Sequence, residues 1–392
     1  MSEIAVIRSA WTEMQRSPES DIDFFSFIIN IRPEVIQPYV LVVCKDGKPV
    51  SLIAGRLEDS RLDIKVGYKT VLHPRVRKLV VFNGGFMGDT TKPVIDAVVR
   101  RLLKSLREEK ADLLIWNGIE WNTTLRQKVK EIPNFLCRDY VTRAVYHWQM
   151  TLPGCIEELF EKRMNKKHRY WAKRASRLLE NDYPGDVRYA SFSSPDDAGS
   201  FFSDVLRVAQ KTYQWGLDVG FQGSEENRRR LMLEAEKGWF RGFILYLKGE
   251  PLAFWICTVY KGTVYLDYTG YDPEFGKYEI GTALLFRIIA ELGRENIRQM
   301  DFGPGTAFYK ERLADSSFEE GIVYAFALSL RGVCFNLLRT LMQLPVGLAR
   351  NLLSRLGLEQ RVKKMWRSCA ALKRESAHLA KSSSRADASR TY

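Results

Sequence analysis

The segment from Phe240 to Ala327 constrains the fold most strongly, because strand and helix patterns follow one another in it in a defined order. Two β-hairpins are predicted by the apolar and aromatic runs of GFILYLKGEPLAFWICTVYKGTVYLDYTGYDPEF, which are separated by short glycine turns. A helix is predicted by the apolar spacing of TALLFRIIAELGREN, and a strand by RQMDFG. A short helix and a last strand are indicated by TAFYKERLA and EEGIVYAFALSL. The predicted order is three antiparallel strands, a helix, a strand, a short helix and a strand.

A weaker copy of this order precedes it in the chain. A hairpin is predicted by YVLVVCKDGKPVSLIAGRL, and its turn resembles Gly249-Glu250-Pro251 of the later segment. A helix and a strand are predicted by PVIDAVVRRLLKSLREE and ADLLIWNG. The sequence therefore indicates an internal duplication with a boundary near Thr151-Leu152-Pro153-Gly154.

A basic segment lies between the two copies. IEELFEKRMNKKHRYWAKRASRLLE predicts one long helix that starts near Cys155 and ends at a turn near Asn181. Its cationic side chains are spread over every face: Lys162, Arg163, Lys166, Lys167, Arg169, Lys173, Arg174 and Arg177. Both a solvated surface helix and a contact with an anionic substrate fit this pattern.

A second basic segment follows Leu330. From Arg331 to Arg374 the chain has seven arginines, three lysines and a single acid, Glu359. Leucines recur among these cations, which is typical of a helix lying in a membrane interface, although a helix packed on a catalytic domain needs the same apolar stripe. Pro345 is expected to break this helical segment into at least two pieces. The polar residues 376–392 are expected to be mobile.

Composition limits the class of protein. A chain of 392 residues with 45% hydrophobic residues can bury the cores of two domains. Its start lacks the apolar run of a secretory signal, and no long uncharged apolar stretch occurs, so we expect a cytoplasmic protein. The six cysteines are dispersed and expected to be reduced and buried. The net charge of +13 favours anionic partners such as nucleic acid, anionic lipid or a phosphate-rich cofactor.

Gly281, Thr282 and Ala283 lie where a predicted strand gives way to a helix. Small residues there let the first backbone N–H groups of the helix approach a phosphate, which the helix dipole also attracts. A glycine that only eases a tight turn would give the same pattern.

Asp301-Phe302-Gly303-Pro304-Gly305 ends the next predicted strand, and Tyr309 and Lys310 follow within one short helix. A phenol held near the strand ends can donate a proton to a leaving thiolate. The alternative is structural, with Asp301 capping a turn and Tyr309 anchoring the helix. The Asp-Phe-Gly triplet is not the magnesium motif of a protein kinase, because the sequence has no HRD-type loop.

Three carboxylates are candidates for the general base that an attacking amine requires. Glu279, Asp267 and Asp301 all lie near the predicted strand ends. Asp267 alternates with Leu266 and Tyr268, so it could face either the substrate or solvent. The histidines are too scattered for a zinc site, and no GxSxG motif occurs, so neither metal nor serine chemistry is supported.

Three motifs in order resemble the CelD-like branch of the GNAT N-acetyltransferases, which is related to the FemAB peptidyltransferases. They are Gly281-Thr282-Ala283-Leu284-Leu285, Asp301-Phe302-Gly303-Pro304-Gly305 and Tyr309-Lys310-Glu311-Arg312, behind the basic helix and the Lys248–Ala253 hairpin. The resemblance covers roughly Asn165 to Leu313. One departure is that the family pyrophosphate motif begins with Arg or Gln, where this chain has Tyr278.

The resemblance implies an α+β (α/β) fold of tandem GNAT-like domains, each a mixed, mostly antiparallel sheet flanked by helices. It implies acetyl-CoA or another acyl-CoA as co-substrate and no metal. The cofactor-binding residues would be Tyr268, Thr269, Gly281, Thr282, Ala283, Gly303, Gly305 and Lys310. Tyr309 would protonate the departing CoA, with Asp301 and Asp267 as the other catalytic residues.

The expected function is acyl-CoA-dependent N-acylation of an amino group of a sugar, a polysaccharide or a lipid-linked cell-envelope precursor, and the acceptor is expected to be anionic. The alternatives are a FemAB-like peptidyltransferase that uses aminoacyl-tRNA, and a non-catalytic module that docks on a membrane or polyanion. The chain would divide into a degenerate GNAT-like domain (1–152), a catalytic domain (153–330), basic amphipathic helices that contact the inner face of the membrane (331–375) and a flexible tail (376–392).

Overall fold

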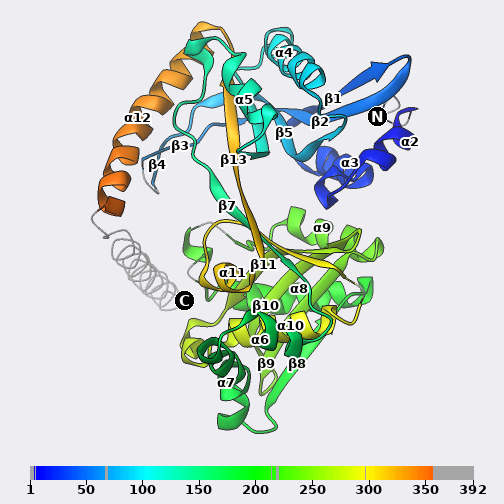
Figure 1. The fold of residues 1–392 in the computed structure, drawn as a ribbon, viewed down its shortest axis with the longest axis vertical. Helices are drawn as coiled ribbons and strands as arrows, with labels where there is room; N and C mark the ends of the chain where they lie inside the picture. The colour runs from blue at the N-terminus through cyan, green and yellow to red at the C-terminus, as the bar shows by residue number, and fades with distance from the viewer. Residues whose placement is uncertain are drawn as a thin grey trace, which may run out of the picture. The chain divides into compact units, whose positions relative to one another are not determined.

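The structure is a computed structural model that describes residues 4, 6–66, 69–212, 214–217, 220–295 and 297–355 (Figure 1). The chain folds into two compact units. The first combines Met1–Gln149 with Pro304–Arg350, and the second is built mainly from Met150–Gly303. The chain therefore enters the second unit once and then returns to the first.

The first unit contains a mixed sheet in which the strand order is β1-β2-β5-β6-β13-β7. These strands are β1 (Val35–Lys45), β2 (Lys48–Arg61), β5 (Arg75–Gly88), β6 (Leu113–Glu120), β13 (Ser316–Phe326) and β7 (Val145–Thr151). Neighbouring strands are antiparallel in this order except β5 and β6, which are parallel. A small hairpin is formed by β3 (Ile64–Val66) and β4 (Lys69–Leu72).

Helices cover this sheet because their apolar stripes match its buried side chains. Helices α4 (Lys92–Glu108) and α5 (Thr124–Glu131) share one core cluster with the sheet, and α2 (Arg8–Met14) and α3 (Ile22–Ile31) share another. The long helix α12 (Leu330–Arg355) contributes to a third cluster together with Ile64 and Phe326. Each cluster removes apolar surface from water, which is the main favourable term in folding.

The second unit has the strand order β12-β11-β10-β9-β8. The strands are β8 (Val187–Phe192), β9 (Phe240–Leu247), β10 (Glu250–Tyr260), β11 (Thr263–Tyr271) and β12 (Gln299–Pro304). Helices α8 (Pro195–Ala209) and α9 (Glu225–Glu236) pack on the sheet through an aromatic-rich cluster around Phe201 and Phe240. Helix α10 (Ile280–Leu292) packs on β9 and β10 and also on α7 (Lys166–Asp182). Helix α6 (Ile156–Arg163) contacts α10 as well.

The two units repeat one topology. In the first, β1, β2 and β5 are antiparallel, and α4 leads to the parallel strand β6. In the second, β9, β10 and β11 are antiparallel, and α10 leads to the parallel strand β12. The predicted fold class, a tandem of mixed sheets flanked by helices, is confirmed. The last predicted strand, β13, pairs with β6 and β7 of the first unit.

Two helix predictions were wrong. The single basic helix is interrupted at Met164 and Asn165, which have extended backbones, and it forms α6 and α7. The side chain of Asn165 accepts a hydrogen bond from the His168 N–H and so caps the new helix. The second error is Pro345, which lies inside α12 without ending it. The preceding turns are held on the first unit by Leu338 and Met342, and this packing offsets the lost hydrogen bond.

The structure also bears on the expectations for the cysteines, for membrane-spanning helices and for the C-terminal residues. Cys44, Cys155 and Cys334 are exposed, contrary to the prediction, whereas Cys137 and Cys257 are buried. Within the described chain, no helix has the length and apolar character needed to cross a membrane. Residues 356–392, which include the second part of the predicted basic extension and the whole predicted tail, lie outside the described residues.

Candidate functional site

Strands β11 and β12 of the second unit separate partway along their length. Thr263, Val264 and Tyr265 pair with Gln299, Met300 and Asp301, and the register ends there although β11 continues to Tyr271. Beyond this point β12 no longer satisfies the backbone donors and acceptors of β11. The C-terminal half of β11 is therefore the part of the sheet where an extended ligand can contact backbone groups.

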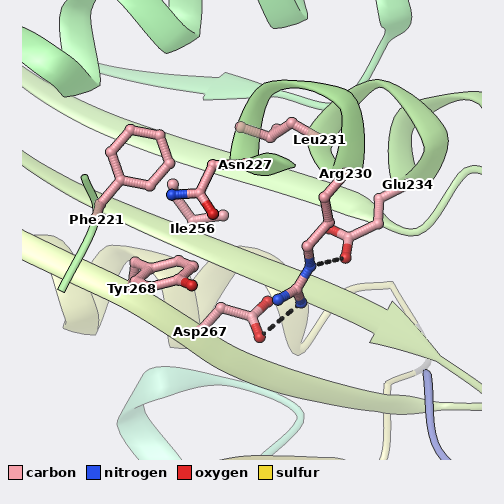
Figure 2. Close-up of a pocket in the computed structure, with 8 residues that line it drawn as sticks. All are labelled: Phe221, Asn227, Arg230, Leu231, Glu234, Ile256, Asp267 and Tyr268. Carbon is pink, nitrogen blue, oxygen red and sulfur yellow. Dashed lines mark hydrogen bonds and ion pairs between the residues drawn. The ribbon is translucent and has the colours of Figure 1, made fainter. Parts of the chain in front are cut away.

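A β-bulge lies at the point of separation. Leu266 pairs with Cys257 and Tyr268 with Ile256, so Asp267 is an extra residue in β11. Consecutive side chains of a regular strand point to opposite faces, but Asp267 and Tyr268 line the same pocket (Figure 2). The sequence left open whether Asp267 faces the substrate or solvent. In the structure, Asp267 faces a pocket beside α9.

The free space in this pocket is about 10 Å³, which is room for about one water molecule. Phe221, Leu231, Ile256 and Tyr268 form its apolar walls, and the rings of Phe221 and Tyr268 are in edge contact with centroids 5.6 Å apart. Asn227, Arg230, Glu234 and Asp267 supply its polar groups. Apolar walls with a few convergent polar groups are the usual composition of a small-molecule site.

The polar groups form one connected network. Arg230 Nε donates to Glu234 Oε1 over 2.6 Å, and Arg230 Nη2 donates to Asp267 Oδ1 over 3.1 Å, as Figure 2 shows. Thr258 Oγ1, on β10, lies 2.6 Å from Asp267 Oδ2 and 3.1 Å from Glu234 Oε2. Glu234 is only 1% exposed. One guanidinium and one hydroxyl are therefore shared by two carboxyl groups.

Burial raises the pKa of Glu234 to about 7, and the charge of Asp267 acts in the same direction, while Arg230 opposes the rise. The Thr258 hydroxyl has one proton and cannot donate to both carboxylates at once. When Glu234 is protonated, its own O–H donates to Thr258 Oγ1, and Thr258 donates to Asp267. The arrangement is a short path along which a proton can move between Asp267 and Glu234.

The raised pKa predicts how stability depends on pH. The folded chain holds the Glu234 proton more tightly than the unfolded chain, whose pKa is near 4.5, so this contribution to the free energy of unfolding is lost as pH rises from about 4.5 to about 7. Relative to Glu234→Gln, the wild type should lose about 3 kcal/mol over this range. Urea unfolding at several pH values measures the difference. Parallel pH curves for the two proteins would show that Glu234 titrates normally.

The start of α10, where the sequence predicts a phosphate site, has a specific geometry. Glu279 precedes the helix in the left-handed region, with φ of +52°, and its carbonyl accepts from Thr282 and Ala283. The N–H groups of Thr282 and Ala283 therefore already donate within the first turn of the helix. Of the three predicted phosphate donors, Gly281 N–H is the one that makes no such hydrogen bond in the helix. A Cβ placed on Gly281 would lie 3.4 Å from the Tyr271 ring, an ordinary contact.

Two residues beside this helix start bear on phosphate binding. Tyr278 is buried, and its hydroxyl donates to Asp182 Oδ2 over 2.9 Å, so it ties the segment before α10 to the end of α7. Glu279 Oε2 is buried without a hydrogen-bond partner in the described chain. A carboxylate at a helix N-terminus is favoured by the dipole and repels a pyrophosphate.

The second predicted constellation is divided between the units. Asp301 is buried in the second unit, and its Oδ1 accepts from Gly303 N–H over 2.7 Å, which matches the turn-capping alternative. Tyr309, Lys310 and Gly305 belong to the first unit. There Lys310 Nζ donates to the Pro304 carbonyl. The catalytic role of Tyr309 and the cofactor roles of Lys310 and Gly305 stay predictions.

The equivalent place in the first unit has different chemistry. In the pairing of β2 with β5, Ile53 lies opposite Phe86 and Gly55 lies opposite Val81. Residues 82–85 of β5 therefore form a bulge that is larger than the one in β11. This bulge carries Asn83 and Gly84 in place of a carboxylate. A Cβ on Gly118 of β6 would lie only 2.1 Å from Asn83 Oδ1, so Asn83 fills the space beside the parallel strand. The carboxyl network therefore belongs to the second unit.

Comparisons with known proteins agree with this topology. Residues 166–311 match the sequence profile of a family described as "Acetyltransferase (GNAT) domain". The match covers most of the second unit and extends into the segment that returns to the first. No curated protein matches the chain. Among the described residues no group of His, Cys, Asp and Glu side chains is arranged to hold a metal ion.

Three solved structures share the fold. A Bacteroides thetaiotaomicron protein of unknown function has a TM-score of 0.51 at 14% identity, covering 83% of this chain and 97% of its own. The C-terminal domain of an Agrobacterium fabrum protein described as a lysylphosphatidylglycerol synthetase has a TM-score of 0.51 at 9% identity, covering 87% and 97%. FemX has a TM-score of 0.50 at 13% identity, covering 77% and 90%. At these identities the likeness extends to the fold alone.

Proposed function

We propose that this protein is an acyl-CoA-dependent N-acyltransferase in which Asp267 deprotonates the acceptor amine. The observation that supports this most directly is the pair of carboxyl groups, Asp267 and Glu234, that share a hydroxyl where β11 and β12 separate. A base at this point can act on a ligand that lies along β11. The acceptor class is the amino group of a sugar, a polysaccharide or a lipid-linked cell-envelope precursor, and the proposed location is the cytoplasm.

The proposed reaction transfers the acyl group directly. The ammonium group of the acceptor gives a proton to Asp267, and the free amine attacks the thioester carbonyl carbon. The C–N bond forms, the C–S bond breaks, and the CoA thiolate leaves with a proton that Tyr309 supplies. The second proton that the attacking nitrogen loses then returns to the Tyr309 phenolate. Thr258 passes the proton from Asp267 towards Glu234, whose pKa near 7 lets it both accept and release a proton at neutral pH. Asp267 is thus restored for the next turnover.

The residues at the start of α10 fit part of what acyl-CoA requires. Gly281 offers a backbone N–H and no side chain in the path of a phosphate, and the adjacent C-terminal half of β11 offers backbone groups to an extended pantetheine. Glu279 opposes the pyrophosphate charge. Acyl-CoA binding therefore requires the Glu279 side chain to turn away from the helix start.

Calorimetric titration with acetyl-CoA tests the donor site. We expect saturable binding that persists at high salt, since the +13 charge alone would give salt-sensitive binding. Gly281→Glu should weaken binding at least about tenfold through charge repulsion. Gly276→Glu is the matched control, because a Cβ there meets only Tyr271 at 3.9 Å and the residue precedes the helix. Equal loss in both variants, or none in either, would contradict the assignment of the pyrophosphate to Gly281.

A second candidate is transfer from aminoacyl-tRNA, and the Glu279 carboxylate favours it. The fold is shared with FemX and with the lysylphosphatidylglycerol synthetase domain, and a donor without CoA needs no pyrophosphate site at α10. Glu279→Gln separates the two functions. Under the first proposal this variant binds acetyl-CoA more tightly than the wild type. If neither protein binds acetyl-CoA while both bind aminoacyl-tRNA, the second function replaces the first.

A further inference from the structure

Helix α12 carries an apolar stripe on the face that points away from the first unit. The stripe consists of Leu330, Cys334, Leu337, Leu341 and Leu344, all exposed, with Leu337 at 57% and Leu341 at 59%. Spacings of four and three residues place these side chains on one side of the helix. Exposed leucines in a continuous row mark an interaction site more often than a solvated surface.

The opposite face of α12 packs on the first unit through both apolar and polar groups. Phe335, Leu338 and Met342 pack against its core. Arg339 is buried and donates to Asp139 Oδ1 over 2.8 Å, and Asn336 Nδ2 donates to the carbonyls of Leu136 and Arg138. The exposed leucines are therefore a second apolar surface, in addition to the one that attaches the helix, and they are suited to contact an apolar phase.

A cationic pocket lies at the N-terminal end of the same helix. Its lining residues are Asp59, Ser60, Arg61, Arg75, Val76, Arg77, Lys110, Asp112 and Arg331, so five cations face two acids. Arg77 pairs with Asp59, and Arg331 pairs with Asp112 over 3.0 Å. Within the described chain, Arg61, Arg75 and Lys110 make no ion pair, and the buried Ser60 Oγ has no hydrogen-bond partner. The pocket offers a phosphate three uncommitted cations and a hydroxyl.

We infer that this face of the first unit docks on an anionic phospholipid bilayer, with lipid phosphates in the cationic pocket and the leucine stripe among the headgroups and upper acyl chains. Helix α12 contains four arginines and no acid, which suits a negatively charged membrane surface. It is not apolar enough to span a bilayer, so it would lie in the plane of the interface. A second copy is a poorer occupant, because a symmetric contact would bring identical cations together.

Vesicle co-sedimentation of the full chain tests this inference. We expect binding to vesicles of phosphatidylcholine mixed with phosphatidylglycerol and about tenfold weaker binding to phosphatidylcholine alone. The double variant Leu337→Glu/Leu341→Glu should lose binding at least about tenfold. Arg61→Glu/Arg75→Glu should remove the preference for phosphatidylglycerol. Arg100→Glu/Lys104→Glu, on the exposed face of α4, is the charge-matched control and should bind like the wild type.

The chain also offers a matched pair of labelling sites. Cys334 lies on the stripe and Cys44 is exposed on β1 of the same unit. A polarity-sensitive fluorophore on Cys334, with Cys44, Cys155 and Cys369 replaced by serine, should shift to the blue when anionic vesicles are added. The label on Cys44 alone should not shift. Unchanged emission at both sites would overturn the inference. A concentration-dependent dimer that Leu337→Glu/Leu341→Glu dissociates would also overturn it, because the stripe would then be a contact between copies of the chain.

Discussion

Replacing Asp267 by asparagine is expected to lower kcat for acyl transfer by about 10²–10⁴-fold, while the affinity for acyl-CoA changes little. The substitution keeps the size of the side chain and its contact with Arg230 but removes the group that accepts the proton of the amine. Because the bulge directs Asp267 into the pocket, the loss should fall on the chemical step rather than on folding. Steady-state kinetics with a series of amine acceptors measures it.

The same helix provides the control for this prediction. Glu225 pairs with Arg229 on α9 at the surface, and Arg229 directly precedes Arg230 of the buried pair. Glu225→Gln changes charge as Asp267→Asn does and should leave kcat within about twofold of the wild type, because exposed pairs contribute little. Thr258→Val should have an intermediate effect, since it breaks the path to Glu234 and leaves the base in place. If the Asp267→Asn protein had the kcat of the wild type, Asp267 and Glu234 would have no part in the mechanism.

Replacing Arg230 by methionine is expected to destabilise the fold by about 2–4 kcal/mol, since it leaves the buried Glu234 and the half-buried Asp267 without their cation. Burial opposes the charge of Arg230, but Glu234 and Asp267 outweigh it and raise its pKa. The loss should be larger at pH 8 than at pH 6, because at pH 6 Glu234 can keep its proton and the repulsion with Asp267 is relieved. Urea unfolding at the two pH values gives both quantities.

Arg229→Met is the control for Arg230→Met, because it removes a cation from the preceding position of the same helix. Its partner Glu225 is 63% exposed and stays solvated, so the free energy of unfolding should change by less than about 0.5 kcal/mol. Similar losses in the two variants would mean that α9 is sensitive to any substitution. A loss in Arg230→Met that is independent of pH would mean that Glu234 does not titrate between pH 6 and pH 8.

Much of the second unit could be predicted from the sequence because its signals are local. Glycine turns between apolar runs give β9, β10 and β11, and helical spacing gives α10. The start of α7 was missed because one asparagine inside a helical pattern is weak evidence until its side chain is known to cap the helix. Pairing of β13 with β6 could not be predicted, since it joins residues about two hundred positions apart in the chain.

The candidate site was only partly predictable for a similar reason. Asp267 and Tyr268 were identified from their place on a strand, but their common direction depends on a bulge that has no sequence signature here. Arg230 and Glu234 were missed entirely. Their spacing of four residues on α9 indicates a helix-stabilising pair, and nothing local distinguishes it from Arg229 and Glu225 on the same helix. The two pairs differ in their surroundings: Arg230 and Glu234 contact Asp267 of β11 and Thr258 of β10, which are distant in the sequence.

The place of β13 has a consequence for the order in which the protein is made. The first unit lacks a strand between β6 and β7 until the ribosome has synthesised residues 316–326, by which time all of Met150–Gly303 has been synthesised. Until then β6 presents an unpaired edge, which is a template for association with other chains. A nascent chain that stalls before β13 should therefore be more prone to aggregate than one that stalls just after it. The second unit must acquire its structure while the first is still incomplete.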